Sequence, residues 1–165
     1  MALDPRMNPE HILFQSLHPA SVRKFDPRDA AAVAEILRGS PEAAEWSVKS
    51  IEQLGQRGEL GWVVENDGGV TGFLVARAIE GEAEVLNLCI DPAKRRFGNA
   101  TALLQVALTQ LPRLGAKVLF LEVRETNLPA ISFYEKHGFV RDGYRPGYYQ
   151  NPTEAAVLMR RELTG

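Results

Sequence analysis

The fold that this sequence predicts is decided by residues 84–138. They open with EVLNLCID (84–91), an apolar run typical of a buried strand, and continue through PAKRRFGNA (92–100) into a long helical pattern. A second apolar run, VLFLEVR (118–124), leads into a short helix that should end at Gly138. Because a crossover helix joins the two strands, they should be parallel neighbours in one sheet.

The flanking segments predict an α+β layered domain over residues 21–163, with one mixed sheet of about seven strands and four helices. Further strands are expected at residues 21–25, 62–65, 70–79, 139–145 and 155–162. Helices are expected from Asp26 to Gly39, Ser47 to Gln56, Asn99 to Arg113 and Thr126 to Gly138. Asn66–Gly69 is typical of a hairpin turn, and Gly72 is a candidate bulge. Residues 1–20, which contain three prolines, are expected to be an irregular lead-in.

Composition excludes several classes of protein. The 165 residues are 45% hydrophobic and 24% charged, which suits one folded domain. A net charge of −2 argues against bulk binding of nucleic acid. There is no apolar run of the ~20 residues that a membrane span needs and no pattern of a secretory signal. With one cysteine, Cys89, no disulfide can form within the chain, and a reducing cytoplasm is expected. His11, His18 and His137 lack metal-ligand spacing, so no metal site is expected.

A candidate phosphate turn runs from Arg95 to Ala100. Gly98 permits a positive φ and close approach of a ligand, and Ala100 is small. Amides from about Phe97 to Ala102 would face outward at a helix N-terminus, which favours a pyrophosphate. Lys94, Arg95 and Arg96 add positive charge. By itself, such a pattern is more often an ordinary turn beside a solvated basic surface.

The motifs together resemble a known family. Arg95-x-x-Gly98-x-Ala100 resembles the R/Q-x-x-G-x-G/A turn of the GNAT superfamily of N-acetyltransferases. The stretch LEVRETN (121–127), followed by Tyr134-x-x-x-Gly138-Phe139, is similar to the RimI-type group, which acetylates the N-terminal alanine of a ribosomal protein. Trp46-Ser47 and Arg145-x-x-Tyr148-Tyr149 resemble further elements of that group. The likeness covers roughly residues 21–163. It departs at Ala100, where a second glycine is usual, at Phe97 and Asn99, and at the shorter loop 150–156.

This resemblance implies acetyl-CoA as the cofactor and a GNAT fold. The implied cofactor-binding residues are Leu88, Cys89, Ile90, Arg95, Arg96, Phe97, Gly98, Asn99, Ala100, Thr101, Asn127 and Tyr134. Leu88 to Ile90 would pair main-chain groups with the pantetheine amides, as an added strand does. Asn127 could equally cap the helix that follows. Cys89 could act as a nucleophile, but a buried structural thiol is the better interpretation, so direct transfer is expected.

Two side chains are candidates for proton transfer. Glu122 is the lone carboxylate in an apolar strand, and the resemblance makes it the base, acting through a water. The alternative is a structural pair with Arg124, two residues along the same strand face. Tyr134 would be the acid that protonates the departing thiolate. Its alternative role is an aromatic core residue.

The acceptor is the least specified part. Trp46, Arg145, Tyr148 and Tyr149 are the candidate acceptor-binding residues. The two tyrosines are placed in a loop, where they would line the acceptor groove or, as the alternative, only hold the loop together. The resemblance implies a peptide or protein N-terminus as acceptor, and a monomer or dimer. One alternative is a GNAT enzyme that acetylates a small-molecule amine or a lysine side chain. Another is a CoA-binding module without turnover.

Overall fold

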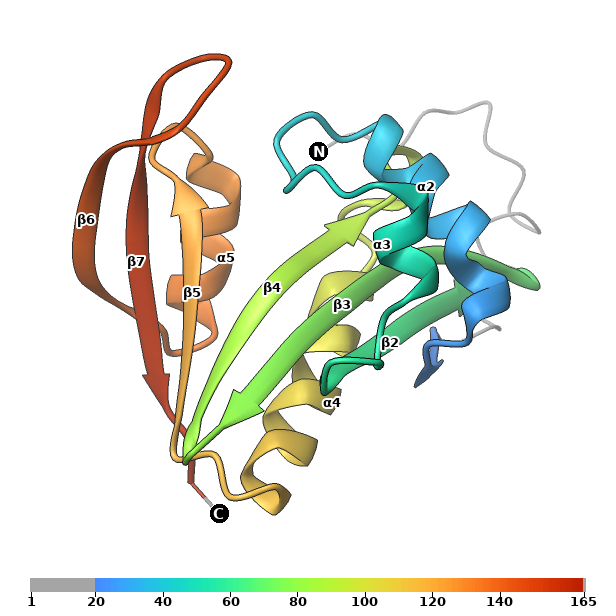
Figure 1. Ribbon diagram of the computed structural model, residues 1–165, viewed down its shortest axis with the longest axis horizontal. Helices are drawn as coiled ribbons and strands as arrows, with labels where there is room; N and C mark the ends of the chain where they lie inside the picture. Colours follow the sequence, from blue (N-terminus) through green and yellow to red (C-terminus); the bar gives the residue numbers. More distant parts are fainter. Residues whose placement is uncertain (1–19, 165) are drawn as a thin grey trace, which may run out of the picture.

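The computed structural model describes residues 20–164 (Figure 1). The lead-in predicted for residues 1–20 lies outside these residues except for Ala20, as do His11 and His18. Within the described part of the chain, no helix combines the length and the apolar character needed to cross a bilayer.

One seven-stranded sheet, in the order β1-β2-β3-β4-β5-β7-β6, forms the centre of the domain. Its strands are β1 (Ser21–Lys24), β2 (Glu59–Asn66), β3 (Gly69–Ile79), β4 (Glu82–Ile90), β5 (Val118–Arg124), β6 (Val140–Tyr149) and β7 (Glu154–Glu162). The α-helices of the described residues are α2 (Ala30–Arg38), α3 (Val48–Glu52), α4 (Asn99–Arg113) and α5 (Leu128–Lys136). β4 and β5 pair in parallel while the other neighbours are antiparallel, so the predicted mixed sheet and crossover are confirmed.

Helices cover the sheet on both faces. α2 and α3 lie over β2, β3 and β4 on one side, and α4 and α5 lie behind the sheet on the other (Figure 1). The larger buried cluster joins Leu103, Leu104 and Leu111 of α4 to Leu119 and Leu121 of β5. A smaller cluster packs α2 and α3 against the opposite sheet face. The 3.6-residue period of α4 and the two-residue period of β5 place these apolar side chains on the core faces.

The feature that positions the site is a split between β4 and β5. The two strands pair only at Glu82↔Val118, Ala83↔Leu119 and Glu84↔Phe120, and then diverge (Figure 1). A register shift in β4, where Val75 faces Asn87 but Ala76 faces Val85, bends β4 away at this point. The facing edges of β4 and β5 therefore keep main-chain groups that no strand partner uses.

Three predicted boundaries differ from the structure by three or four residues. The helix expected from Ser47 to Gln56 ends at Glu52, because the Glu59 carboxylate accepts hydrogen bonds from the Gly55 and Arg57 amides (3.2 and 3.0 Å) and holds a turn there. β2 begins at Glu59, three residues before the predicted Trp62, because residues 59–61 pair with residues 75–77 of β3. β6 runs on to Tyr149, past the predicted end at Arg145, because a register shift between Arg145 and Tyr149 accommodates the intervening residues.

Gly72 has a packing role beside a bulge. The register shift in β2–β3 leaves Thr71 as the extra residue, one position from the predicted Gly72. A Cβ atom on Gly72 would lie 2.4 Å from Ile90 Cδ1 and 3.0 Å from the Cys89 carbonyl oxygen. The glycine therefore lets β3 approach the end of β4 closely.

We expect Gly72→Ala to lower the free energy of unfolding by about 1–3 kcal/mol, as overpacking of a core does. Urea denaturation measures the change. Gly69→Ala is the matched control, since no atom lies within 4 Å of its Cβ position in the same strand. Equal midpoints for the two variants would contradict the close approach.

Candidate active site

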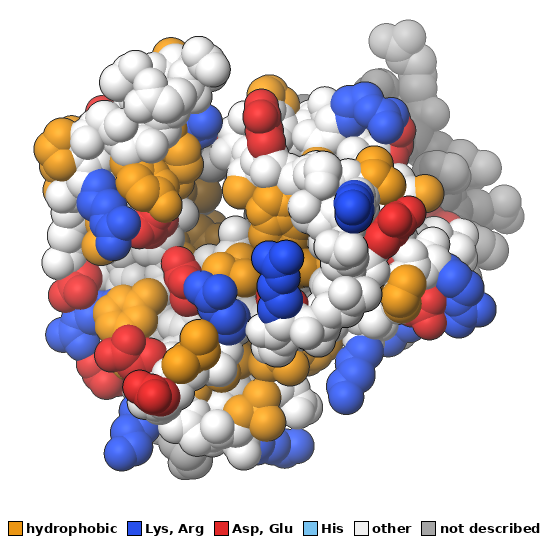
Figure 2. Space-filling model, in the orientation of Figure 1, with side chains coloured by type: hydrophobic (Ala, Val, Ile, Leu, Met, Phe, Trp, Pro, Cys, Tyr) orange, Lys and Arg blue, Asp and Glu red, His pale blue; other side chains and the backbone are white. Residues whose placement is uncertain are grey.

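A cavity of about 980 Å³ occupies the split between β4 and β5. Figure 2 shows the hollow between the two halves of the sheet, with hydrophobic side chains on its floor. It is lined by these predicted site residues: Trp46, Leu88, Cys89, Ile90, Arg95, Arg96, Gly98, Asn99, Ala100, Thr101, Glu122, Asn127, Tyr134, Tyr148 and Tyr149. Phe97 does not line it and is 64% exposed. Arg145 lines a second cavity of about 630 Å³, which shares Glu84, Leu121 and Glu122 with the first.

The turn before α4 has the conformation that its sequence predicts. Gly98 has φ +83° and is the residue before the helix, and Arg96 also has a positive φ, +66°. Ala102 donates the first main-chain hydrogen bond of the helix, to the Gly98 carbonyl (3.0 Å). The amides of Asn99, Ala100 and Thr101 thus have no partner within the helix and lie at the positive end of its dipole. An anion can bind here.

Asn99 carries an unsatisfied polar atom into the same region. The side chain is 3% exposed, and its Nδ2 donates to the Lys94 carbonyl (3.0 Å). Its Oδ1 is buried without a hydrogen-bond partner among the described residues. The Nδ2 contact fixes the orientation of the amide, so Oδ1 remains a buried acceptor without a partner in the described part of the chain. A thioester cofactor with amides and hydroxyls along its length fits this cavity.

Arg95 and Arg96 differ in what they contact. Arg95 donates to the Ile90 carbonyl (3.1 Å), Ser40 Oγ (2.9 Å) and Glu42 Oε1 (2.5 Å). Arg96 makes no hydrogen bond or ion pair with the described part of the chain. Of these two arginines, Arg96 is therefore the one whose positive charge no carboxylate of the described residues neutralises.

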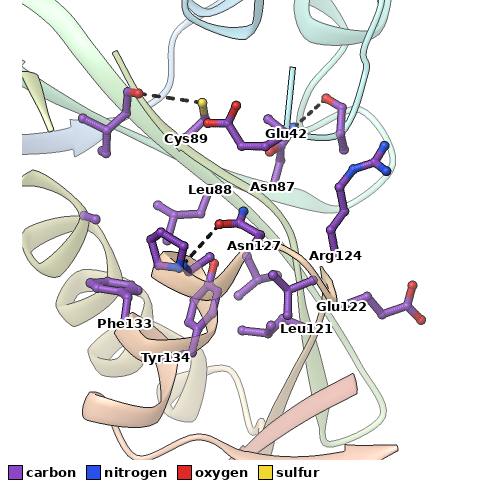
Figure 3. A pocket seen from close by; sticks show the side chains of 18 of the residues that line it. Glu42, Asn87, Leu88, Cys89, Leu121, Glu122, Arg124, Asn127, Phe133 and Tyr134 are labelled. Atoms are coloured by element: carbon purple, nitrogen blue, oxygen red, sulfur yellow. Dashed lines mark hydrogen bonds between the residues drawn. The ribbon is translucent and has the colours of Figure 1, made fainter. Parts of the chain in front are cut away.

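Glu122 extends from β5 on the side of the strand away from Leu121 (Figure 3). Its side chain is 18% exposed, and Oε1 lies 3.3 Å from Arg145 Nη1. The nearby Glu122 carboxylate raises the pKa of Tyr148. The alternative pairing with Arg124 is wrong. Arg124 instead pairs with Glu154 at 3.2 Å and lies 4.2 Å from the Tyr149 ring centroid.

Tyr134 lies on α5 with its hydroxyl directed into the cavity (Figure 3). The ring is 8% exposed and makes edge contacts with Phe133 and Phe139, at 5.3 and 5.4 Å between centroids. Burial raises its pKa well above the ordinary value, because phenolate is poorly solvated there. The side chain is thus a core residue whose phenol keeps its proton.

Asn127 caps α5, as one of its two predicted roles requires. Its Oδ1 accepts from the Ala130 amide (3.3 Å), and the same side chain lines the cavity beside Tyr134 (Figure 3). The cap uses the carbonyl oxygen only, which leaves the amide nitrogen for a ligand.

The candidate acceptor-binding side chains come from both walls of the cavity. Trp46, in the segment between α2 and α3, packs on Phe73 with 6.5 Å between centroids. Tyr148 and Tyr149 meet edge to face at 5.1 Å. They end β6, so their predicted place in a loop is wrong, although both line the cavity. Burial raises the pKa of Tyr149 to about 12.

Some residues that line the cavity, or that hold its lining in place, were missed from the sequence. Asn87 is buried on β4 and donates to the Ala44 carbonyl (3.2 Å), and Ser40 and Glu42 hold Arg95. A signal for Asn87 was present, since it is a lone polar residue in an apolar strand, as Glu122 is. For Ser40 and Glu42 no local signal exists, because their partner lies more than 50 residues away.

We expect Gly98→Ala to lower the affinity for acetyl-CoA at least about tenfold. The alanine would disturb the positive φ of the turn, so the turn amides would move away from the charged group that they bind. Its stability should fall by only about 1 kcal/mol, because the strain is confined to the backbone. Gly115→Ala is the matched control, with φ +88° and equally open space at the other end of α4. Calorimetric titration and urea denaturation separate the two effects. Equal affinities for acetyl-CoA would contradict a ligand at the turn.

Comparison with known proteins agrees with this geometry. The model of the acetyltransferase (GNAT) family matches residues 29–139. The chain belongs to this family. It is therefore an N-acetyltransferase, and enzymes of the GNAT family use acetyl-CoA.

Relatives within the family narrow the likeness. The [ribosomal protein bS18]-alanine N-acetyltransferase of Escherichia coli K12 is 31% identical over 119 residues, which are 71% of this chain and 80% of the relative. The crystal structure of the ribosomal-protein-S18-alanine N-acetyltransferase from Escherichia coli has a TM-score of 0.78 at 27% identity, covering 88% of this chain and 95% of that one. Ard1 from Thermoplasma volcanium has a TM-score of 0.79 at 27% identity, covering 88% and 99%. The GNAT fold and the RimI-type resemblance are thus confirmed.

Proposed function

We propose that this GNAT enzyme acetylates the N-terminal α-amino group of a protein, with a ribosomal protein as the acceptor. The observation that carries the proposal is the similarity to bS18-alanine N-acetyltransferases over most of their length. It is supported by Glu122 and Tyr134, which line one cavity from two different elements.

In this proposal the turn and α4 hold acetyl-CoA. The amides of Asn99 to Thr101 bind the pyrophosphate at the helix N-terminus, assisted by Arg96. The free edge of β4 at Leu88 to Ile90 pairs with the pantetheine amides, because the split leaves its main-chain groups without a strand partner. The Asn127 amide nitrogen, which the helix cap leaves free, offers a further polar contact within the cavity.

Two proton transfers complete the reaction. An α-amino group has a pKa near ~7.7–8.0 and is largely protonated at neutral pH, so Glu122 removes a proton, through a water, before the nitrogen attacks the thioester carbonyl. Tyr134 donates its phenolic proton to the departing thiolate sulfur. Its raised pKa keeps the phenol protonated at neutral pH, so a proton is present when the thiolate departs.

The test is an acceptor panel with acetyl-CoA. A peptide with a free α-amine and no lysine should be acetylated at its first residue, as shown by mass spectrometry. The same sequence with a blocked N-terminus and an added lysine should not react, and neither should a polyamine. Acetylation of the polyamine or the lysine alone would replace the proposal by the small-amine or lysine alternative. Acetyl-CoA binding with no acetylation anywhere would indicate a module without turnover.

A further inference from the structure

The contacts of Arg95 do not match those of a phosphate ligand. A guanidinium has five N–H donors. Nε donates to the Ile90 carbonyl, and Nη2 donates to both Ser40 Oγ and Glu42 Oε1. Three of the five donors are thus occupied, and the Glu42 carboxylate neutralises the charge at 2.5 Å. Only Nη1 remains for an anion.

These contacts join two segments that lie far apart in the chain. Ser40 and Glu42 belong to residues 39–47, the segment between α2 and α3, which we call the wall loop. Ser40 is 1% exposed, so its hydroxyl is a fixed attachment point. A second tie exists, since buried Asn87 of β4 donates to the Ala44 carbonyl at 3.2 Å. The wall loop is therefore fastened to β4 and to the turn before α4.

The wall loop forms one side of the cavity. Glu42, Ala43, Ala44 and Trp46 all line it, opposite Glu122 and Tyr148. Figure 3 shows Glu42 and Asn87 on one side and Tyr134 and Leu121 on the other. An acceptor chain that reaches Glu122 through this cavity meets both the wall loop and the end of β6, because Trp46 and Tyr148 line the same cavity. The position of the loop thus affects the width of the cavity.

We propose that Arg95 is a positioning residue for the acceptor, which holds the wall loop against the cofactor turn and is not a pyrophosphate ligand. The inference rests on the proposed function, because it assigns the wall loop to the acceptor. It also explains how one turn serves both substrates. The main-chain amides after Gly98 face the cofactor, while the side chain of Arg95 reaches the other wall.

The experiment compares Arg95→Met, Glu42→Gln and their double variant with Arg96→Gln. Arg113→Gln, at the far end of α4, is the neutral control. Acceptor KM is measured with a peptide that has a free α-amine. Donor affinity is measured by calorimetry with acetyl-CoA and with acetyl-pantetheine, which lacks the pyrophosphate.

Arg95→Met should raise the acceptor KM about tenfold, as expected for lost hydrogen bonds to a charged group, and change acetyl-CoA affinity less than about twofold. Glu42→Gln should act in the same direction, and the double variant should be no worse than Arg95→Met, because the two residues act through one contact. Arg96→Gln should instead weaken acetyl-CoA and spare acetyl-pantetheine.

The opposite pattern would overturn the inference. If Arg95→Met weakens acetyl-CoA tenfold and spares acetyl-pantetheine, Arg95 is a phosphate ligand. An unchanged acceptor KM in both Arg95→Met and Glu42→Gln would also overturn the inference. If Arg95→Met folds poorly, the acceptor KM of Glu42→Gln alone makes this test. If the wild type acetylates no peptide, the proposed function fails by that result alone. The donor titrations then still show whether Arg95 binds phosphate.

Discussion

Glu122→Gln should lower kcat/KM by about 10²-fold or more, because the amide cannot accept the proton of the acceptor amine. Gln has the same shape as Glu, so acetyl-CoA affinity should not change. The acid limb of the pH profile, which reports protonation of the essential base, should flatten in the variant. Steady-state kinetics with the α-amine peptide across pH measures both effects.

Glu125→Gln is the control for this variant. Glu125 follows the same strand and accepts a hydrogen bond from the exposed Tyr144 hydroxyl (2.9 Å), outside the cavity lining. Its removal should leave kcat/KM unchanged. Stability should also change little in Glu122→Gln, since Arg145 is 53% exposed and a solvent-accessible pair contributes about 0–1 kcal/mol. A Glu122→Gln enzyme with wild-type kcat/KM would exclude Glu122 as the base.

Tyr134→Phe is the second large effect, with kcat expected to fall about 10²-fold. The variant keeps the ring and its edge contacts with Phe133 and Phe139, so packing and acetyl-CoA affinity should be preserved. Because burial raises the pKa of Tyr134, its proton-donating form is present at every pH below that raised value. The loss of rate should therefore be the same from pH 6 to pH 9, with no new limb in the profile.

Tyr144→Phe serves as the matched control, since this tyrosine is 56% exposed and also loses only a hydroxyl. It should retain full kcat. A thioester donor with a more acidic thiol needs less help from an acid, so such a donor should recover part of the rate in Tyr134→Phe. If the rate does not depend on the leaving thiol in either enzyme, Tyr134 acts in some other way.

Local chemistry explains why so much of the fold follows from sequence. The start of α4 can be predicted from the sequence because Gly98 permits the positive φ of the turn, and an apolar 3.6-residue period begins directly after it. The N-terminal cap of α5 can be predicted from the sequence because Asn127 lies two residues before Pro129, which suits the first turn of a helix. The boundaries that failed, at α3 and at β6, depend on contacts made beyond the segment itself. At the end of α3 the contact is the hydrogen bond that the Gly55 amide donates to the Glu59 carboxylate. At the end of β6 it is the pairing of β6 with β7.

The sequence by itself determined which groups are the candidates for the chemistry. A lone carboxylate at Glu122, a tyrosine at Tyr134 and a glycine turn at Gly98 are fixed by residue type and by the period of the elements that carry them. Only the tertiary structure decided what each group faces. Arg145 lies 23 residues beyond Glu122, and Glu42 lies 53 before Arg95, so neither pairing has a local pattern. The split that makes the cavity likewise arises from a register shift between β3 and β4, which depends on how two strands pair and not on the sequence of either strand alone.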